Sequence, residues 1–357
     1  MSGSVVILTS QPPEAAGGVE SFVRLLIRGF ADRGYDVETL NRNLVPRWME
    51  GAGRALKLQA VVEGLSIGRA ARARSANATV ISNSTIGWYP LPAAIRRVHM
   101  FHGTYRGMAE AIKPFISRKG YTKLKYYDSM TLERVSGRGK TCLCNSDQTR
   151  EEVESFFGIP CSTVWLPLDT GFWKPQDKQE CRRLLRLDPG AFIGLYAGSD
   201  HPQKGFSTVM ALLSARRDVN WVMALRGSSS FRPPEGIRVW NDASPEVMRS
   251  LYGAADFVIA PSRYEPFGYI VAEALAVGVP VITTPGGAST EFMSPMASLT
   301  VDNGDNVAGF SRAIDEVHES SAALQKVIAE QVRPKLESLL SPPNWWNGFL
   351  IKAGMAE

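Results

Sequence analysis

The order of apolar runs, loops and glycines over residues 255–283 constrains the fold more than any other stretch of the chain. An apolar run rich in β-branched residues at 255–260 is followed by a loop, a helical segment that ends in a glycine, and a second apolar run at 279–283. This order predicts a βαβ unit with parallel strands, and its loop then lies at the edge of the sheet where α/β proteins bind ligands. Glu265 lies in this loop, and Glu273 lies about two turns into the helix. Two carboxylates and a helix N-terminus are therefore expected together at this edge of the sheet.

The same alternation of strand, loop and helix opens each half of the chain. The first half begins with a strand at 5–9, a loop ending in Gly17 and Gly18, and an amphipathic helix. The second half begins with a strand at 192–197 and a loop that contains Lys204. Glycines let a backbone approach a ligand, and the N-terminus of a helix attracts phosphate. Both loops are candidate phosphate-binding segments.

The length of 357 residues favours two domains. We predict an α/β protein with two Rossmann-like domains over residues 1–170 and 171–340, joined by a hinge where turn residues flank bulky aromatics at 169–175. The tail over 341–357 carries Trp345 and Trp346 after a proline break and is predicted to dock on an apolar surface.

Composition excludes several classes of function. The formal net charge of +5 is too small to indicate nucleic-acid binding, and no apolar run approaches the ~18 residues of a membrane span. The N-terminus enters a strand within a few residues, which predicts a cytoplasmic protein without a secretion signal. The four cysteines lack the spacing of zinc ligands and are expected to be buried reduced thiols. No Asp-x-Asp motif suggests a metal site.

Residues 105–140 differ from the rest of the chain in charge. This segment holds nine basic and three acidic residues, with tyrosines interleaved among the lysines. Basic residues with interfacial aromatics suit an anionic membrane surface or an anionic acceptor. The alternative is a solvated helical face packed by its aromatic side.

Each local signal also has a structural explanation. Gly17 and Gly18 fit a tight turn, lysines such as Lys204 are common at helix starts, and His102, directly after a strand at 98–101, could be a satisfied structural residue. His99, inside that strand, is expected in the core. Taken together, however, the two glycine loops, the lysine and the carboxylate pair are accounted for by one ligand: a nucleotide with a diphosphate, held between two Rossmann-like domains.

The stretch from Glu265-Pro266-Phe267-Gly268 to Glu273 resembles the Glu-x7-Glu signature of the retaining GT-B glycosyltransferases, and it is most similar to glycosyltransferase family 4. The resemblance covers most of the chain and thins at 41–79 and within the basic segment. It implies a GT-B fold, in which two Rossmann-like domains face a central cleft and a C-terminal helix crosses back to the N-terminal domain. The N-terminal domain would then be the acceptor side and the C-terminal domain the nucleotide-sugar side.

The resemblance also implies roles for individual residues. Glu273 would bind the ribose hydroxyls of the donor, Glu265 would hold the donor sugar, and His102 would face the sugar and the reaction centre. Lys204 would neutralise the diphosphate, with Arg263 or Arg226 as a supplement, because Ser199 follows Gly198 where many relatives have arginine. The other implied nucleotide-sugar contacts come from loop and helix-start residues: Gly17, Gly18, Phe267, Gly268, Tyr269 and Ile270.

The activity implied by the resemblance is retaining transfer of a hexose from a nucleotide-diphosphate sugar, without a metal or other cofactor. The implied acceptor is a glycan or lipid-linked envelope molecule, reached by a cytoplasmic enzyme that is peripheral to the membrane. Two alternatives remain: a GT-B epimerase or phosphorylase, and a sugar-nucleotide-binding protein without turnover. The residues do not fix the sugar, the base or the acceptor.

Overall fold

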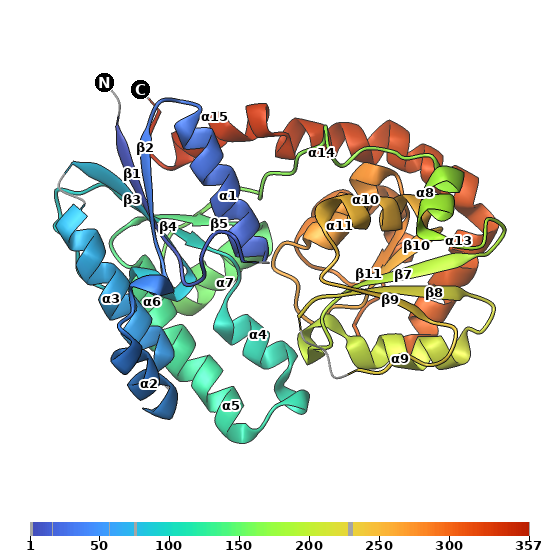
Figure 1. The fold of residues 1–357 in the computed structure, drawn as a ribbon, viewed down its shortest axis with the longest axis horizontal. Helices are drawn as coiled ribbons and strands as arrows, with labels where there is room; N and C mark the ends of the chain where they lie inside the picture. The colour runs from blue at the N-terminus through green and yellow to red at the C-terminus, as the bar shows by residue number, and fades with distance from the viewer. Residues whose placement is uncertain (1–2, 16, 57, 75–76, 228–230, 357) are drawn as a thin grey trace. The chain divides into compact units, whose positions relative to one another are not determined.

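Two compact units make up the protein in the computed structural model, which describes residues 3–15, 17–56, 58–74, 77–227 and 231–356 (Figure 1). Unit 1 comprises Met1–Pro167 and Trp345–Glu357, and unit 2 comprises Leu168–Asn344. Each unit is built on its own parallel β-sheet with helices packed against it. The predicted α/β class with two Rossmann-like domains is therefore confirmed.

Unit 1 contains a six-stranded sheet in the order β2-β1-β3-β4-β5-β6. Its strands are β1 (Ser4–Leu8), β2 (Asp36–Leu40), β3 (Ala78–Asn83), β4 (Arg97–Phe101), β5 (Thr141–Cys144) and β6 (Ser162–Thr163). Its helices are α1 (Gly18–Ala31), α2 (Arg47–Leu56), α3 (Gln59–Arg74), α4 (Tyr105–Ala111), α5 (Arg118–Thr122), α6 (Arg134–Gly137) and α7 (Asp147–Phe157), with short turns η1 (Arg42–Leu44), η2 (Ser84–Gly87) and η3 (Lys113–Phe115) and a π-helical stretch η4 (Lys123–Glu133).

Unit 2 contains a five-stranded sheet in the order β11-β10-β7-β8-β9. Its strands are β7 (Ile193–Gly198), β8 (Asn220–Leu225), β9 (Arg238–Asn241), β10 (Phe257–Ala260) and β11 (Val281–Thr283). Its helices are α8 (Lys178–Leu185), α9 (Phe206–Ala215), α10 (Pro245–Ala254), α11 (Tyr269–Val277), α12 (Ala288–Phe292), α13 (Val307–Val327) and α14 (Arg333–Leu340), with η5 (Pro202–Lys204), η6 (Ser294–Leu299) and the π-helical η7 (Ile328–Val332).

Both sheets have a point at which the direction of strand addition reverses. In unit 1, β1 pairs with β2 on one side and with β3 on the other. In unit 2, β7 pairs with β8 on one side and with β10 on the other. Loops diverge at the C-terminal ends of the strands at such a switch point and leave room for a ligand. The loops after β1, β3, β7 and β10 are therefore the places where a site is expected.

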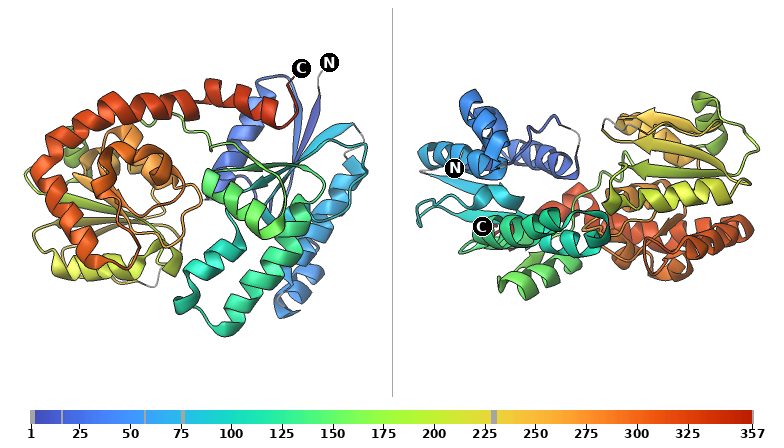
Figure 2. Two further views of the ribbon diagram at one scale, coloured as in Figure 1. Left: turned by 180° about the vertical axis from the view of Figure 1, so that it is seen from behind. Right: turned by 90° about the horizontal axis from the view of Figure 1, so that it is seen from below.

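The last helix, α15 (Pro342–Lys352), belongs mainly to unit 1 and lies alongside α1 (Figures 1 and 2). Helix α1 turns a fully buried stripe that includes Phe22 and Phe30 towards the interior. Trp345 packs edge-to-face on Phe22, and Trp346 does the same on Phe30 with ring centroids 5.0 Å apart. Gly29 makes room for this contact, because a Cβ atom there would lie 1.9 Å from the Trp346 ring. The predicted docking of the tryptophans on an apolar surface is confirmed.

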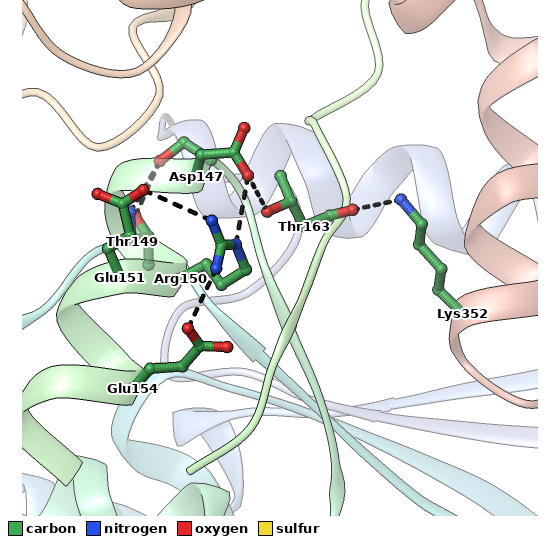
Figure 3. Close-up of polar contacts among 8 residues, drawn as sticks. Asp147, Thr149, Arg150, Glu151, Glu154, Thr163 and Lys352 are labelled. Carbon is green, nitrogen blue, oxygen red and sulfur yellow. Dashed lines mark hydrogen bonds and ion pairs between the residues drawn. The ribbon is translucent and has the colours of Figure 1, made fainter. Parts of the chain in front are cut away.

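Polar contacts also tie α15 to the edge of the unit 1 sheet (Figure 3). The Lys352 ammonium donates to the Thr163 carbonyl at 2.6 Å, and the Thr163 hydroxyl donates to Asp147 at 2.6 Å. Asp147 opens α7, where it also accepts from Arg150 at 3.4 Å. These contacts are exposed, so they fix the position of the helix end more than they add stability.

The structure differs from the sequence prediction in several local features. Strand β6 has only two residues, and the chain reaches the unit boundary at Pro167 shortly after it. Strand β2 was not singled out, since its side chains are mostly part-exposed and polar. His99 is buried as predicted. All four cysteines are free thiols, and three of them are buried, whereas Cys161 is partly exposed.

Candidate functional site

The loops after β7 and β10 meet at the switch point of unit 2 through one ion pair. The Lys204 ammonium lies 2.7 Å from Oε2 of Glu265, and the Ser262 hydroxyl donates to the same oxygen at 3.1 Å. The side chains of Lys204 and Glu265 are 30% and 16% exposed, so a ligand can reach both groups. A cation and a carboxylate are thus presented together at the edge of the sheet, where the sequence predicted them.

Backbone contacts lock these two loops against each other. The Arg263 amide donates to the Gln203 carbonyl at 2.8 Å, and the Gln203 side chain donates to the Tyr264 carbonyl at 3.0 Å. Gly205 has φ +66°, and a Cβ atom there would lie 1.9 Å from the Pro261 carbonyl oxygen. Only glycine fits this close approach in a left-handed conformation. The position of Lys204 is therefore set by a rigid backbone junction.

Arg263 is a bridge between loops in this structure. Its guanidinium donates to the Ser207 hydroxyl at 2.8 Å, to the Pro202 carbonyl and to the Asp305 carboxylate, and its side chain is 4% exposed. These contacts hold the loop that carries Glu265 against the start of α9. A contact between Arg263 and a nucleotide stays a prediction.

Helix α11 begins directly behind Glu265, and its N-cap residue is a glycine that has no side chain to cap it. Gly268 precedes it in the left-handed conformation, with φ +86°. Phe267 is buried, and Tyr269 and Ile270 are partly exposed. Gly287 lets the next loop approach this turn, because a Cβ atom there would lie 2.3 Å from the Phe267 carbonyl oxygen. The positive end of the helix dipole is thus available beside Glu265 for a negatively charged group.

Glu273 lies on the same helix and is partly buried. The Tyr252 hydroxyl of α10 donates to Oε2 of Glu273 at 2.9 Å. Burial raises the pKa of Glu273 to about 7, and the Tyr252 hydroxyl and the positive charge of Arg226 oppose this rise. The carboxyl group is therefore close to its titration point at neutral pH. A ligand that hydrogen-bonds to the ionised form would pull it fully to the carboxylate.

Gly198 and Ser199 form the start of the loop after β7. The Tyr196 hydroxyl donates to the Ser199 carbonyl at 2.7 Å, and a Cβ atom on Gly198 would lie 2.8 Å from the same hydroxyl. A buried tyrosine thus fixes the loop that leads to Lys204. Both residues lie where the sequence placed them, and their contact with a donor stays a prediction.

His102 lies at the C-terminal edge of the unit 1 sheet, directly after β4, which is two strands from β1. Its Nε2 is 2.8 Å from Oδ1 of Asn83, and the Asn83 amide nitrogen donates to the Leu8 carbonyl at 3.0 Å. Because the Asn83 oxygen can only accept, Nε2 carries the proton and Nδ1 carries a lone pair. Nδ1 is buried without a hydrogen-bond partner among the described residues.

The surroundings of His102 keep it neutral. Burial lowers the pKa of His102 to about 3, and the ring of Phe22 packs edge-on with centroids 5.2 Å apart. A neutral imidazole with a free lone pair accepts a hydrogen bond from a hydroxyl group and does not act as a cation at neutral pH. Sequence analysis missed Asn83, although a polar residue at the end of a buried strand was a signal for it.

The glycine loop of unit 1 ends at the start of α1. Gly17 precedes the helix and Gly18 is its first residue. A Cβ atom on Gly17 would lie 1.5 Å from the Glu20 carboxylate, so that side chain lies over the turn. A phosphate at this turn would meet the Glu20 carboxylate unless the side chain rotates. Ala16, in the same loop, lies outside the described residues.

The structure therefore gathers the predicted residues at two sheet edges. In unit 2, Lys204 and Glu265 are in contact, and the start of α11 and Glu273 follow on one helix. In unit 1, the glycine loop follows β1 and His102 follows β4, at the same edge of the sheet with β3 between the two strands. Tyr252 and Asp305 are further contributors that sequence analysis did not find, because both are defined by contacts between segments distant in the sequence.

Comparison with known proteins identifies relatives of both halves. A family model described as Glycosyltransferase Family 4 matches residues 16–170, and one described as Glycosyl transferases group 1 matches residues 192–320. The chain is 29% identical over 154 residues to a D-inositol 3-phosphate glycosyltransferase from Segniliparus rotundus, which covers 38% of this chain and 34% of that protein. It is also 29% identical over 189 residues to a lipopolysaccharide core biosynthesis mannosyltransferase from Rhizobium meliloti, which covers 47% and 54% respectively. The matches thus span about a third and about half of these relatives.

Solved structures share the whole fold at low sequence identity. Sucrose-phosphate synthase from Thermosynechococcus elongatus superposes with a TM-score of 0.78 at 17% identity, covering 99% of this chain and 97% of its own. The HepE protein of Anabaena in complex with UDP-glucose superposes with a TM-score of 0.71 at 13% identity, covering 99% and 100%. At these identities the likeness concerns the fold.

Proposed function

Because this chain belongs to the glycosyltransferases of family 4, with the GT-B fold, we propose that it moves a hexose from a nucleotide-diphosphate sugar to a glycan or lipid-linked envelope acceptor. Unit 2 binds the donor in this proposal, and unit 1 contributes the acceptor side. The transfer is retaining and needs no metal ion.

One observation carries the proposal: the contact of Lys204 with Glu265 beside the start of α11, with Glu273 farther along the same helix. A nucleotide sugar has three parts that match these groups. Its diphosphate needs positive charge, which Lys204 and the helix N-terminus offer. Its sugar and ribose present hydroxyl groups, which the carboxylates of Glu265 and Glu273 can accept.

The transfer step follows from these assignments. The bond between the anomeric carbon and the diphosphate oxygen breaks, and a bond between that carbon and an acceptor hydroxyl oxygen forms on the same face. The acceptor proton passes to the leaving diphosphate, whose developing charge Lys204 and the α11 amides stabilise. Preorganised electrostatics of this kind lower a barrier without a covalent intermediate on the protein. Neutral His102 accepts a hydrogen bond from a sugar hydroxyl through Nδ1.

The names of the relatives support the choice of partners. One relative is named an inositol phosphate glycosyltransferase, another a lipopolysaccharide core mannosyltransferase, and a structural neighbour is described in complex with UDP-glucose. A nucleotide-sugar donor and an envelope acceptor are consistent with all three. A binding protein without turnover, or an epimerase, would leave the glycan acceptor without a role, whereas a phosphorylase would use a glycan but no nucleotide.

The donor assignment predicts selective stabilisation by nucleotides. Screening UDP, GDP, ADP, CDP and dTDP and their glucose or mannose conjugates by thermal unfolding should show one base series that raises Tm, because a ligand bound only by the folded state stabilises it by mass action. The best conjugate is then incubated with lipopolysaccharide-core and lipid-linked acceptors, and the anomeric configuration of the product is read by NMR. Binding without transfer to any acceptor would favour the non-enzymatic alternative, and an inverted product would contradict the retaining mechanism.

We also propose that the basic segment contacts an anionic membrane. A groove in unit 1 is lined by Arg118, Lys119, Thr122, Lys123, Tyr126 and Tyr127. Arg118 and Lys119 are exposed, and Tyr126 is 55% exposed. Lys123 is paired with Asp128 at 2.6 Å, and the charge of Lys125 is matched by Glu110. None of the described helices has both the length and the apolar character needed to cross a bilayer.

Removing the exposed cations tests this contact. We expect Arg118→Ala/Lys119→Ala to bind vesicles of phosphatidylglycerol and phosphatidylcholine more weakly, by roughly 30-fold at low salt, because each cation near an anionic surface contributes about 1 kcal/mol. The difference should shrink as salt is raised. The matched control is Arg217→Ala/Lys326→Ala, which removes the same charge from unit 2. No vesicle binding by the parent protein, or equal binding by both double variants, would leave the solvated-face explanation in place.

A further inference from the structure

A buried tyrosine in unit 2 holds the carboxylate that the proposed function assigns to the ribose. Tyr252 is fully buried in α10, with its ring packed edge-on against Trp173 at a centroid distance of 5.7 Å. Its hydroxyl points at α11 and donates to Oε2 of Glu273 at 2.9 Å. The hydroxyl has no other hydrogen bond within the part of the chain that the structure describes. It therefore has Glu273 as its single acceptor.

The hydrogen bond with Tyr252 makes the two oxygens of the Glu273 carboxylate different. Oε2 accepts from the tyrosine, whereas Oε1 accepts no hydrogen bond from any described residue. A carboxylate oxygen can accept up to two hydrogen bonds, so Oε1 has full capacity for the hydroxyls of a ligand. The Tyr252 ring is fully buried and packed on Trp173, so its hydroxyl marks a defined position for Oε2.

We propose that Tyr252 is a positioning residue for nucleotide recognition: by holding Oε2 of Glu273 it orients the carboxylate so that Oε1 is presented to the vicinal hydroxyls of a ribose. This inference rests on the proposed function, because it presumes that a nucleotide binds unit 2. It goes beyond that function by assigning ribose selectivity to the Tyr252–Glu273 pair and not to Glu273 alone.

The charged groups around Glu273 make the proposal measurable as a pH effect. Burial raises the pKa of Glu273, and the Tyr252 hydroxyl and Arg226 lower it. On the other elements packed against α11, Glu291 of α12 and Lys335 of α14 lie 2.7 Å apart and offset each other. The tyrosine hydroxyl is thus the principal hydrogen-bond donor that favours the ionised carboxyl.

The sign of the pH effect follows from these contacts. Ribose hydroxyls donate to the carboxylate, so binding favours the ionised form, and affinity is highest above the apo pKa of about 7 and falls below it. Tyr252→Phe removes a donor to the ionised form, so the apo pKa of Glu273 rises. The pH at which affinity begins to fall should then move upward by about one unit, the size expected for a hydrogen bond to a charged group.

The experiment measures affinity against pH from 6 to 9 for the ribonucleoside diphosphate that stabilises the parent protein best among UDP, GDP, ADP and CDP. Glu273→Gln cannot titrate, so its profile supplies the contribution of every other group, including the nucleotide phosphate. Tyr196→Phe is the matched control, because it removes another buried hydroxyl of unit 2, one bonded to the Ser199 carbonyl. We expect any effect of Tyr196→Phe on affinity to be the same at every pH, so that the shape of the pH profile does not change.

Ribose selectivity gives a second readout. The parent protein should prefer the ribonucleotide over its 2′-deoxy form, Glu273→Gln should lose most of this preference, and Tyr252→Phe should lose part of it at pH 7 and regain it at pH 9. A uniform loss of affinity in Tyr252→Phe at every pH, with unchanged selectivity, would show a purely structural role and overturn the inference. If no nucleotide binds the parent protein, the proposed function itself fails and the inference falls with it.

Discussion

Glu265→Gln is expected to lower the rate constant of transfer by about 10²–10³-fold, the usual effect of removing one group that stabilises a transition state. The carboxylate lies 2.7 Å from the Lys204 ammonium and accepts from Ser262 at 3.1 Å. Glutamine has the same size as glutamate but no negative charge. It therefore neither orients Lys204 nor accepts a strong hydrogen bond from a sugar hydroxyl. Nucleotide affinity should stay within a few-fold of the parent value, because Glu273 and the start of α11 are untouched.

The measurement compares kcat for transfer with the dissociation constant of the nucleotide. Glu180→Gln is the matched control, since Glu180 is an exposed glutamate of unit 2 that is also paired with a basic residue, Arg183, at 2.7 Å. The two variants should have similar Tm values, because partly exposed ion pairs contribute only about 0–1 kcal/mol to stability. A Glu265→Gln enzyme with normal kcat and a large loss of nucleotide affinity would show that Glu265 binds the nucleotide and not the sugar.

Gly205→Ala should destabilise unit 2 and abolish donor binding together. The residue has φ +66°, and its new Cβ atom would lie 1.9 Å from the Pro261 carbonyl oxygen, which is backbone and cannot rotate away. Positive-φ strain alone costs about 1–3 kcal/mol for a residue other than glycine. Relief of the clash must also separate the loops that carry Lys204 and Glu265. We expect Tm to fall by roughly 4–8 °C or more and no nucleotide to raise it.

Gly236→Ala is the control that isolates the close contact. Gly236 also has positive φ, +86°, but a Cβ atom there would meet nothing within 4 Å. The Gly236→Ala variant should therefore be destabilised only by backbone strain. Nucleotides should still raise its Tm. Equal Tm values for the two variants, or a normal nucleotide response in Gly205→Ala, would contradict the proposed junction between the loops.

The periodicity and spacing of the sequence were sufficient to predict the parts of the site that depend only on the order of elements along the chain. The stretch from 255 to 283 predicted strand, loop, helix and strand, and the structure has β10, α11 and β11 at those positions. Glu265 in the loop and Glu273 in the helix follow from that order alone. The sheet edge that presents them follows from the parallel connection.

The partners of these residues could not be predicted in the same way. Tyr252 lies 21 positions from Glu273, and Asp305 lies 42 positions from Arg263. Such pairs depend on how helices pack and loops fold over the sheet, and local periodicity carries no information about either. Arg263 shows the consequence: its sequence position suggested a ligand contact, whereas its guanidinium is buried among three protein partners.

The docking of α15 on α1 has a consequence for the synthesis of the protein. Unit 1 is discontinuous, since its last helix is made only after the whole of unit 2. Until residues 345–356 leave the ribosome, the apolar stripe of α1 around Phe22 and Phe30 has no Trp345 or Trp346 to cover it. The nascent first half must therefore carry an exposed apolar face through the translation of about 175 further residues, which takes roughly 10–35 s at ordinary elongation rates. Unit 2, which is continuous, can complete its fold first.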